Sequence, residues 1–227
     1  MYVTTRTLDP GRGRAADALD EPVRRLVPPD YLRLLRTLGA GTYCDEVDVT
    51  VPDARILPET YGARTHFWTL DEAFDADDLR AAVQIGRSAD GDAFCCTPRH
   101  PGVVFILPRH ACAVEAFPTF EAALASRVPG VAAPWYDPAY DAVVEIISLA
   151  TPTGLRDIAP IYDAFRQAFS ADFVAGEKTQ PRHFFQAFGG WVSFDLVYRS
   201  SLTVKHQARH QRAAAPVLGF VRRYAAP

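Results

Sequence analysis

The middle of the chain, residues 83–124, has the most regular pattern of apolar and polar positions. Val83–Cys96 contains two apolar runs separated by the turn-forming pair Asp90–Gly91, which predicts a strand, a tight turn and a second strand. A third apolar run follows at Gly102–Leu107 and predicts another strand. Pro118–Thr119 then opens an Ala- and Phe-rich stretch that is typical of a helix. No group of residues in this stretch has the composition of a catalytic site.

The N-terminal part begins without periodicity and then becomes regular. Residues 1–21 are rich in Gly, Arg and Asp, which predicts a flexible lead-in. A helix is predicted over 28–38, because proline suits its first turn and apolar residues follow at three- and four-residue spacing. Glu46–Val51 alternates between polar residues and valine, which predicts a half-buried strand that ends at Pro52–Asp53. Residues 71–83 predict a short acidic helix.

The last hundred residues contain both clear and ambiguous segments. Residues 133–138 include two prolines, which predicts a connector without regular structure. Residues 143–149 form a short apolar run that fits either a strand or part of a helix. Thr153 is expected to cap a helix. The apolar face of that helix would consist of Ile158, Tyr162, Phe165 and Phe169. Further strands are predicted over 191–198, 202–206 and 217–221.

Charge is unevenly distributed along the chain. Residues 181–227 carry seven Lys or Arg and one acidic residue, whereas residues 1–180 carry 17 basic and 26 acidic residues. An acidic block of this size can attract a basic partner, and it equally fits a solvated surface. The basic residues near the C-terminus are scattered among apolar ones, so the pattern does not predict a nucleic-acid surface.

Composition favours a cytoplasmic globular protein. No apolar run reaches the about 18 residues that a membrane helix needs, and Met1–Arg6 lacks the apolar core of a signal peptide. Four cysteines in a chain of this length fit reduced thiols better than a disulfide framework. The cysteines are Cys44, Cys95, Cys96 and Cys112.

Several short motifs follow one another between Val23 and Val128. They are a Pro-containing helix start and a Gly-rich helix end, an Ile-Gly and a Gly-Asp pair, a Gly-Val-aromatic strand, and a Phe-containing helix: Pro28–Tyr31, Leu38–Gly41, Ile85–Gly86, Gly91–Asp92, Gly102–Phe105, Ala116–Phe117 and Phe120–Leu124. Their order and spacing resemble the SUKH superfamily of Smi/Knr-like proteins. The resemblance covers about half of the chain.

The resemblance implies a fold and a role. It implies an α+β domain over 22–130, with a central, mostly antiparallel sheet and helices packed against it. Residues 131–227 would form a C-terminal α/β extension or a small second α+β subdomain. Many bacterial members of the superfamily are similar to immunity proteins that neutralise a toxin, often a nuclease. The resemblance therefore implies a protein-binding role and supplies no catalytic residues.

Three patterns with possible chemistry have simpler interpretations. His206 and His210 have the spacing of a helical metal pair, but along a strand this spacing would separate them by roughly 13 Å. Neighbouring side chains of a strand point to opposite faces, so Cys95 and Cys96 suit one buried and one half-buried thiol. Ser88 lacks the second glycine and the following helix of a nucleophile elbow.

The densest cluster of acidic residues lies at 71–78. It consists of Asp71, Glu72, Asp75, Asp77 and Asp78. Acidic residues suit the start of a helix, which is one interpretation, and a contact patch for a basic partner is the other. Asp45, Glu46 and Asp48 could extend this patch if their strand lies beside it. Trp68 would be an interface anchor if it is exposed, although most such aromatic residues belong to the core.

The sequence therefore predicts a non-catalytic protein-binding module, an immunity protein whose acidic face covers a basic toxin domain. A regulatory or scaffold module with an endogenous partner is the alternative. A third hypothesis is a hydrolase or nuclease that uses His183, His206 or His210. No cofactor or metal ion is predicted, and the sequence indicates no particular oligomeric state.

Overall fold

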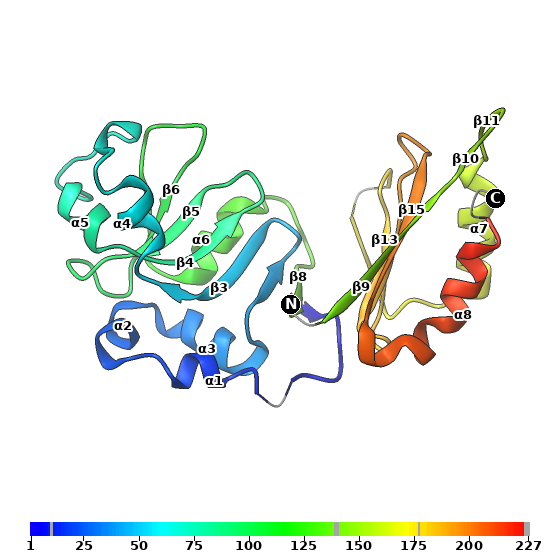
Figure 1. The fold of residues 1–227 in the computed structure, drawn as a ribbon, viewed down its shortest axis with the longest axis horizontal. Helices are drawn as coiled ribbons and strands as arrows, with labels where there is room; N and C mark the ends of the chain where they lie inside the picture. The colour runs from blue at the N-terminus through cyan, green and yellow to red at the C-terminus, as the bar shows by residue number, and fades with distance from the viewer. Residues whose placement is uncertain (10, 139–140, 177, 225–227) are drawn as a thin grey trace. The chain divides into compact units, whose positions relative to one another are not determined.

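The structure is a computed structural model that describes residues 1–9, 11–138, 141–176 and 178–224. The chain divides into two compact units (Figure 1). We call Leu8–Pro138 the N-terminal unit, and Met1–Thr7 together with Ala139–Pro227 the C-terminal unit. Each unit contains its own antiparallel sheet and its own helices. The predicted α+β class with a mostly antiparallel sheet is confirmed.

In its described residues, the N-terminal unit contains six α-helices and the seven strands β2–β8. The helices are α1 (Arg14–Asp17), α2 (Glu21–Leu26), α3 (Pro29–Leu38), α4 (Ile56–Tyr61), α5 (Ala76–Ala81) and α6 (Phe120–Arg127). The strands are β2 (Gly41–Tyr43), β3 (Val47–Asp53), β4 (Val83–Ser88), β5 (Ala93–Cys96), β6 (Val104–Leu107), β7 (Glu115–Phe117) and β8 (Trp135–Pro138). A 3-10 turn, η1, covers Thr65–Phe67.

Within this unit the strands are ordered β8-β2-β3-β4-β5-β6-β7, and every neighbouring pair is antiparallel. Helices cover both faces of the sheet. Phe94 faces α6, where its ring lies 6.4 Å from the ring of Phe120. The next residue, Cys95, packs with Leu57 of α4 and Leu79 of α5 on the opposite face. Strand β5 is therefore enclosed on both sides.

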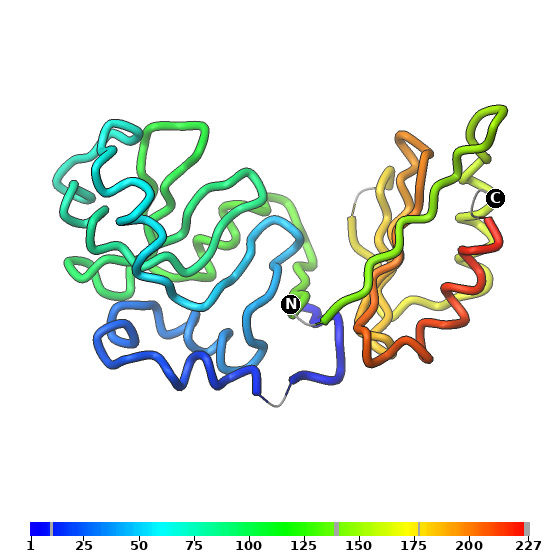
Figure 2. Tube along the Cα trace, viewed as in Figure 1, coloured from blue at the N-terminus to red at the C-terminus, as the bar shows by residue number. Residues whose placement is uncertain are grey.

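The C-terminal unit contains a five-stranded sheet with helices on one face (Figure 1), and a separate two-stranded sheet formed by β10 and β11. The strands within the unit are β1 (Tyr2–Val3), β9 (Ala142–Ser148), β10 (Ala150–Thr151), β11 (Gly154–Leu155), β12 (Phe173–Ala175), β13 (Arg182–Phe185), β14 (Gly190–Phe194) and β15 (Ser201–Gln207). Its helices are α7 (Ile158–Ala168), η2 (Ala208–His210) and α8 (Gln211–Arg222). The five-stranded sheet has the order β12-β13-β14-β15-β9. The chain passes from β9 through the β10–β11 hairpin to α7 (Figure 2).

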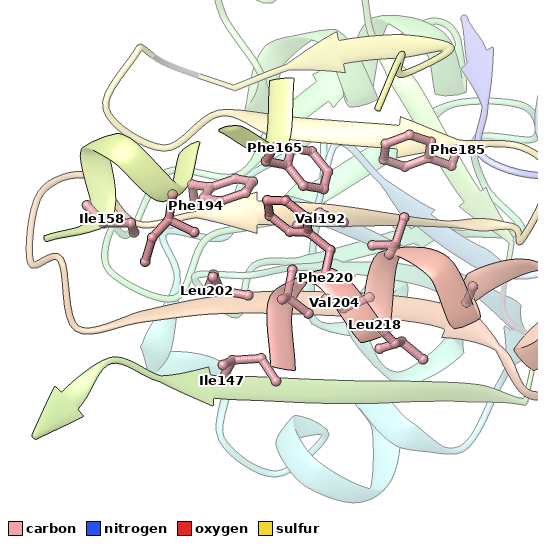
Figure 3. Packing of buried hydrophobic residues seen from close by; sticks show 14 of the residues in the cluster. Ile147, Ile158, Phe165, Phe185, Val192, Phe194, Leu202, Val204, Leu218 and Phe220 are labelled. Atoms are coloured by element: carbon pink, nitrogen blue, oxygen red, sulfur yellow. The ribbon is translucent and has the colours of Figure 1, made fainter. Parts of the chain in front are cut away.

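Aromatic side chains form the core of the C-terminal unit between the sheet and its two helices. Figure 3 shows Phe165 of α7 and Phe220 of α8 pointing toward Val192 and Phe194 of β14. The ring of Phe165 lies 5.0 Å from that of Phe194 and 5.9 Å from that of Phe220. Alternating residues of the sheet supply this core, as expected for a sheet covered on one face.

Several predicted elements are confirmed. The helix predicted over 28–38 is α3, and Gly39 ends it with a φ of 81°, a conformation that glycine adopts without strain. The run 143–149, for which the sequence left a strand and a helix open, lies mostly in strand β9, Ala142–Ser148. The strand predicted over 202–206 is β15. The helix predicted after residue 153 is α7.

The helix cap predicted at Thr153 is wrong. Asp157 caps α7, because its side chain accepts a hydrogen bond from the backbone N–H of Ala159. Thr153 lies instead in the turn of the β10–β11 hairpin, where its hydroxyl is 3.4 Å from that of Thr151. An Asp directly before the apolar run was the better cap signal.

Two segments near the predicted domain boundary and the C-terminus also differ from prediction. Residues 133–138 are not an irregular connector, because Trp135–Pro138 pairs with Gly41–Tyr43 as strand β8. The unit therefore extends to Pro138 rather than ending at 130. The strand predicted over 217–221 is part of α8. The buried residues of α8 follow helical spacing: Ala214, Val217, Leu218 and Val221. Residues 217–221 alone are too few to show this spacing.

Other predicted boundaries shift. Strand β3 continues through Pro52 to Asp53, with an irregular register opposite β4 that accommodates the proline. The strand predicted over 191–198 ends at Phe194, and Asp195 then accepts hydrogen bonds from the N–H groups of Val197 and Tyr198.

The first 21 residues differ from the flexible lead-in that the sequence predicts. Ala16 of α1 is fully buried, and so is Thr4. Tyr2 stacks on Phe173, with the ring centroids 4.5 Å apart. Met1–Thr7 belongs to the C-terminal unit, where the side-chain amide of Gln186 donates a hydrogen bond to the carbonyl of Val3 at 3.0 Å.

Candidate partner-binding site

The acidic stretch 71–78 is a loop followed by the short helix α5. The Asp71 carboxylate accepts hydrogen bonds from the backbone N–H groups of Ala73 and Phe74, at 2.8 and 3.2 Å. Asp75 accepts from the N–H groups of Asp77 and Asp78, and the Asp78 carboxylate accepts from the N–H of Asp75. This reciprocal pair is a capping box. The helix predicted over 71–83 is thus confined to Ala76–Ala81.

Arginine side chains compensate most of the remaining charge in this stretch. Arg99 forms ion pairs with Asp78 and with Asp75, the latter at 2.9 Å. Arg80 pairs with Asp77 at 2.6 Å. The backbone N–H of Asp78, together with that of Asp77 and the charges of Arg99 and Arg80, lowers the pKa of Asp75 below its usual range.

Two of the residues predicted for the interface are buried. Trp68 is 8% exposed, and its indole N–H donates to the carbonyl of Pro108 at 2.8 Å. It is therefore a core residue and not an exposed anchor. The side chain of Asp78 is only 3% exposed, and its carboxylate is bound by Arg99 and the helix cap. A partner can reach neither side chain, so the prediction that Trp68 and Asp78 contact a partner is wrong.

Glu46 and Asp48 are exposed but lie away from the acidic stretch. The carbonyl of Glu46 accepts from the N–H of Ala89, directly after the C-terminal end of β4. Helix α5 ends at Ala81, just before the other end of β4. The length of β4 separates these ends by roughly 17 Å. Two groups of carboxylates therefore exist, instead of the single extended patch that the sequence suggested.

Asp48 is also close to a basic side chain of the neighbouring strand. It stands directly opposite Arg87 in the β3–β4 ladder, and its carboxylate accepts a hydrogen bond from Thr42 at 3.1 Å. Opposite charges at facing positions of a sheet attract each other. The carboxylate of Asp48 thus has local partners within its own sheet.

A pocket lies beside the acidic loop. Its volume is about 130 Å³. It is lined by residues of the loop and of the β6–β7 region: Thr69, Asp71, Ala73, Phe74, Phe105, Ala113, Val114 and Ala116. We call this set the acidic pocket. A cavity of ~150 Å³ admits a benzene-sized group, so the acidic pocket has room for about one side chain.

The acidic pocket combines an apolar base with one acidic residue, Asp71, at its rim. Phe74 and Phe105 are buried, and their ring centroids lie 5.0 Å apart. Asp71 and Glu72 are exposed, and Asp71 lines the pocket. Asp71 is visible in the sequence as part of the acidic stretch, but the pocket beside it is not. Its other wall comes from residues about forty positions later in the chain, which no local pattern connects with the loop.

Two of the three histidines named for a hydrolase, His183 and His206, do not come together. His183 and His206 lie on β13 and β15, which are separated by β14. Two strand spacings of about 4.8 Å each place their backbones roughly 10 Å apart or more. The His183 ring is buried beside Phe165 and 3.3 Å from the hydroxyl of Tyr162. Burial, together with the charge of Arg166, lowers the pKa of His183.

The paired cysteines are both fully buried, which corrects the prediction of one half-buried thiol. Strand β5 is covered on both faces, so its side chains are buried whichever face of the sheet they point to. Burial raises the pKa of each thiol. In the part of the chain that the structure describes, no cluster of three or more His, Cys, Asp or Glu residues is placed to hold a metal ion. No helix in those same residues has the length and apolar character needed to cross a membrane.

Comparisons of the chain with protein-family models, with curated proteins and with solved structures gave no match. The resemblance to the SUKH superfamily therefore stays a prediction from the sequence motifs. The residues of the candidate site are assigned from their geometry.

Proposed function

We propose that the protein is a non-catalytic protein-binding module of the immunity type, which acts in the cytoplasm on a basic protein partner. Its N-terminal unit would bind that partner at the acidic pocket and cover a basic surface of it. A regulatory module with an endogenous basic partner would use the same surface. The two differ only in what is bound.

The observation that carries the proposal is an exposed carboxylate, Asp71, in the lining of a small apolar pocket, with a second exposed carboxylate, Glu72, next to it in the chain. Asp71 and Glu72 have no arginine partner among the ion pairs of the described residues, unlike Asp75, Asp77 and Asp78. A Lys or Arg side chain suits such a site, because its aliphatic stem can pack on Phe74 and Phe105 while its charged end reaches the rim. Exposed carboxylates also accelerate the association of a basic protein.

The proposal narrows the surface that the sequence predicted. Asp71 and Glu72 become the main acidic contacts, because Asp75, Asp77 and Asp78 pair with arginines of the same unit. Glu46 and Asp48 lie beyond the other end of β4 and would contribute only to long-range attraction. This difference gives the test its matched control.

The first test is a peptide selection that needs no known partner. The full-length protein is used to select peptides from a random display library. The affinity of each selected peptide is then measured for the natural protein and for its variants. We expect Lys- or Arg-containing peptides whose affinity falls at least tenfold for Glu72→Lys and for the pocket-filling Ala116→Phe. Glu46→Lys carries the same charge change and should leave affinity within about twofold.

Two results would overturn this site. Selected peptides could lack basic residues, or Glu72→Lys and Glu46→Lys could weaken binding equally. Asp71→Asn refines the test, because the amide oxygen can still accept from Ala73 and Phe74 while the charge is removed. Circular dichroism of each variant confirms that a loss of binding is not a loss of folding.

The second test addresses the immunity role. The protein is co-expressed with polypeptide toxin domains encoded beside its gene, and cell survival is recorded. Survival should depend on Glu72 and not on Glu46. If the protein binds a neighbouring toxin domain without protecting cells, the immunity role is wrong while the binding site stands.

A further inference from the structure

Strand β9 (Ala142–Ser148) is a long terminal strand of the sheet in the C-terminal unit. It pairs with β15 over its whole length of seven residues without a register shift. In an antiparallel ladder, alternate residues direct their N–H and C=O groups away from the paired neighbour. The outer side of β9 thus offers a regular row of backbone donors and acceptors.

Other terminal strands of the two sheets are protected by being short. At the opposite end of the same sheet, β12 has three residues, and β7 at one end of the N-terminal sheet also has three. Short strands, bulges, prolines and outward lysines are the usual protections of a sheet edge. Strand β9 contains no proline or lysine, and its residues are mostly β-branched.

One face of β9 is apolar and open. Val144 and Ile146 are 54% and 71% exposed. They stand opposite Lys205 and Thr203 of β15, on the face of the sheet away from α8. An exposed apolar strand with an open edge is a strong template for pairing with another strand.

The single charge of β9 has an internal partner. The Glu145 carboxylate accepts two hydrogen bonds from the Arg222 guanidinium of α8, at 2.5 and 3.0 Å. This bidentate pair lies on the helix-covered face of the sheet, because Glu145 faces buried Val204. Because Arg222 neutralises it, the Glu145 carboxylate opposes strand pairing at the outer edge less than a free carboxylate would.

We propose that β9 pairs antiparallel with β9 of a second copy of this chain, about a two-fold axis at Glu145. In this register Val144 faces the partner copy's residue 146 and Val143 faces its residue 147. Two pairs of apolar residues therefore lie on each side of the two-fold axis. Shifting the axis to residue 144 or 146 places Glu145 opposite Val143 or Ile147, and the apolar matching is lost. The sequence of β9 is thus complementary to itself, as a two-fold interface requires.

The helices leave room for this arrangement. Helix α8 packs on β15, so the two copies of α8 would be separated by three strand spacings. Three spacings amount to about 14 Å, and packed helices need only 8–10 Å. The two Glu145 carboxylates would face each other, each neutralised by Arg222 of its own chain. Two five-stranded sheets would then become one continuous sheet.

The test is the mass of the full-length protein by sedimentation equilibrium over ~1 to ~100 μM, the range in which a micromolar dimer dissociates. We expect a dimer for the natural sequence and at least a tenfold higher dissociation constant for Ile146→Lys. Val174→Lys is the matched control, because Val174 is 52% exposed on the short edge strand β12. It should leave the dimer unchanged.

The register is tested by cross-linking in a Cys112→Ser background, which removes the exposed thiol. A short thiol cross-linker should join two copies of Glu145→Cys, because these positions face each other at the axis. Ser148→Cys should not react between copies, because its two positions would lie roughly 20 Å apart.

Several results would overturn the proposal. A monomer at every concentration would do so, as would a dimer that is indifferent to Ile146→Lys. Stronger cross-linking of Ser148→Cys than of Glu145→Cys would exclude this register. Unfolding curves of the lysine variants separate a lost interface from a lost fold. None of these results depends on the acidic pocket, so the proposed function is tested independently.

Discussion

The two units share the α+β class but differ in charge and in the protection of their sheets. The N-terminal unit carries 20 acidic and 13 basic residues, a net charge of −7, whereas the C-terminal unit carries 7 acidic and 11 basic residues, a net charge of +4. The N-terminal sheet has helices on both faces, and the C-terminal sheet has helices on one. The overall charge of −3 conceals this division of properties.

Each unit therefore offers a different type of contact. An acidic loop beside a small pocket favours a basic side chain, and its attraction depends on salt. A long open strand favours backbone pairing, and its strength depends mainly on apolar and hydrogen-bonding contacts. The chain can therefore bind a partner with one unit and a copy of itself with the other.

The largest expected effect tests whether the two cores are independent. Phe165→Ala removes a fully buried ring that contacts Phe194 and Phe220 in the C-terminal unit. We expect a loss of about 4 kcal/mol in the unfolding free energy of that unit, from lost burial and the cavity left behind. Denaturant unfolding followed by Trp191 fluorescence measures it.

The control for this prediction lies in the other unit. Trp68 and Trp135 belong to the N-terminal unit, so their transition should be unaffected by Phe165→Ala. Single-tryptophan versions of the protein separate the two signals. A shared shift of both transitions would show that the units unfold as one cooperative body.

A smaller effect is expected at the buried carboxylate of the N-terminal unit. Arg99→Ala removes the ion-pair partner of Asp78, whose side chain is almost fully buried. We expect a loss of about 2 kcal/mol in the stability of this unit, because a buried acceptor loses its charged donor. Chemical denaturation followed by the tryptophans of this unit measures the change.

Arg80→Ala is the matched control for Arg99→Ala. Arg80 pairs with Asp77, whose side chain is 91% exposed, and such surface pairs contribute little. Its unfolding midpoint should remain close to that of the natural sequence. Equal destabilisation by the two variants would contradict the role assigned to Asp78.

Some elements of the fold could be predicted from the sequence and others could not. Helix α3 and strand β15 were predictable, because each has an internal periodicity that burial of one face explains. Strand β8 and helix α8 were not. Pro134 precedes strand β8 and Pro138 is its last residue, so neither proline interrupts the pairing with β2. The apolar run within α8 is too short to distinguish a helical from a strand period.

The candidate site shows the same limit. The acidic residues of the loop were visible, but the sequence could not show that Arg99, more than twenty positions later, binds Asp75 and Asp78. Nor could it show that Ala113 lies beside Thr69 as a wall of the pocket. Both facts depend on contacts between distant segments, which leave no local pattern.

The smallest expected effect distinguishes the units by pH. Burial and the nearby charge of Arg166 lower the pKa of His183 below its unfolded value. The folded C-terminal unit therefore disfavours the protonated imidazole, and its stability is fully present above pH ~6.5 and falls as the pH decreases. Unfolding at pH 7 and pH 5 should show this loss for Trp191 fluorescence.

His183→Phe is the control, because a phenyl ring suits the surrounding Tyr162, Phe165 and Phe194 and does not titrate. Its C-terminal unit should lose less stability between pH 7 and pH 5 than that of the natural sequence. An unchanged pH dependence would assign the effect to other groups.

Binding of a basic partner at the acidic pocket can be measured by titrating an isolated partner domain over a range of salt concentrations. We expect log affinity to fall as salt increases for the natural sequence and for Val174→Lys, and Glu72→Lys to be both weaker and less sensitive to salt. If Glu72→Lys leaves the affinity and the salt dependence unchanged, the acidic pocket is not the binding site.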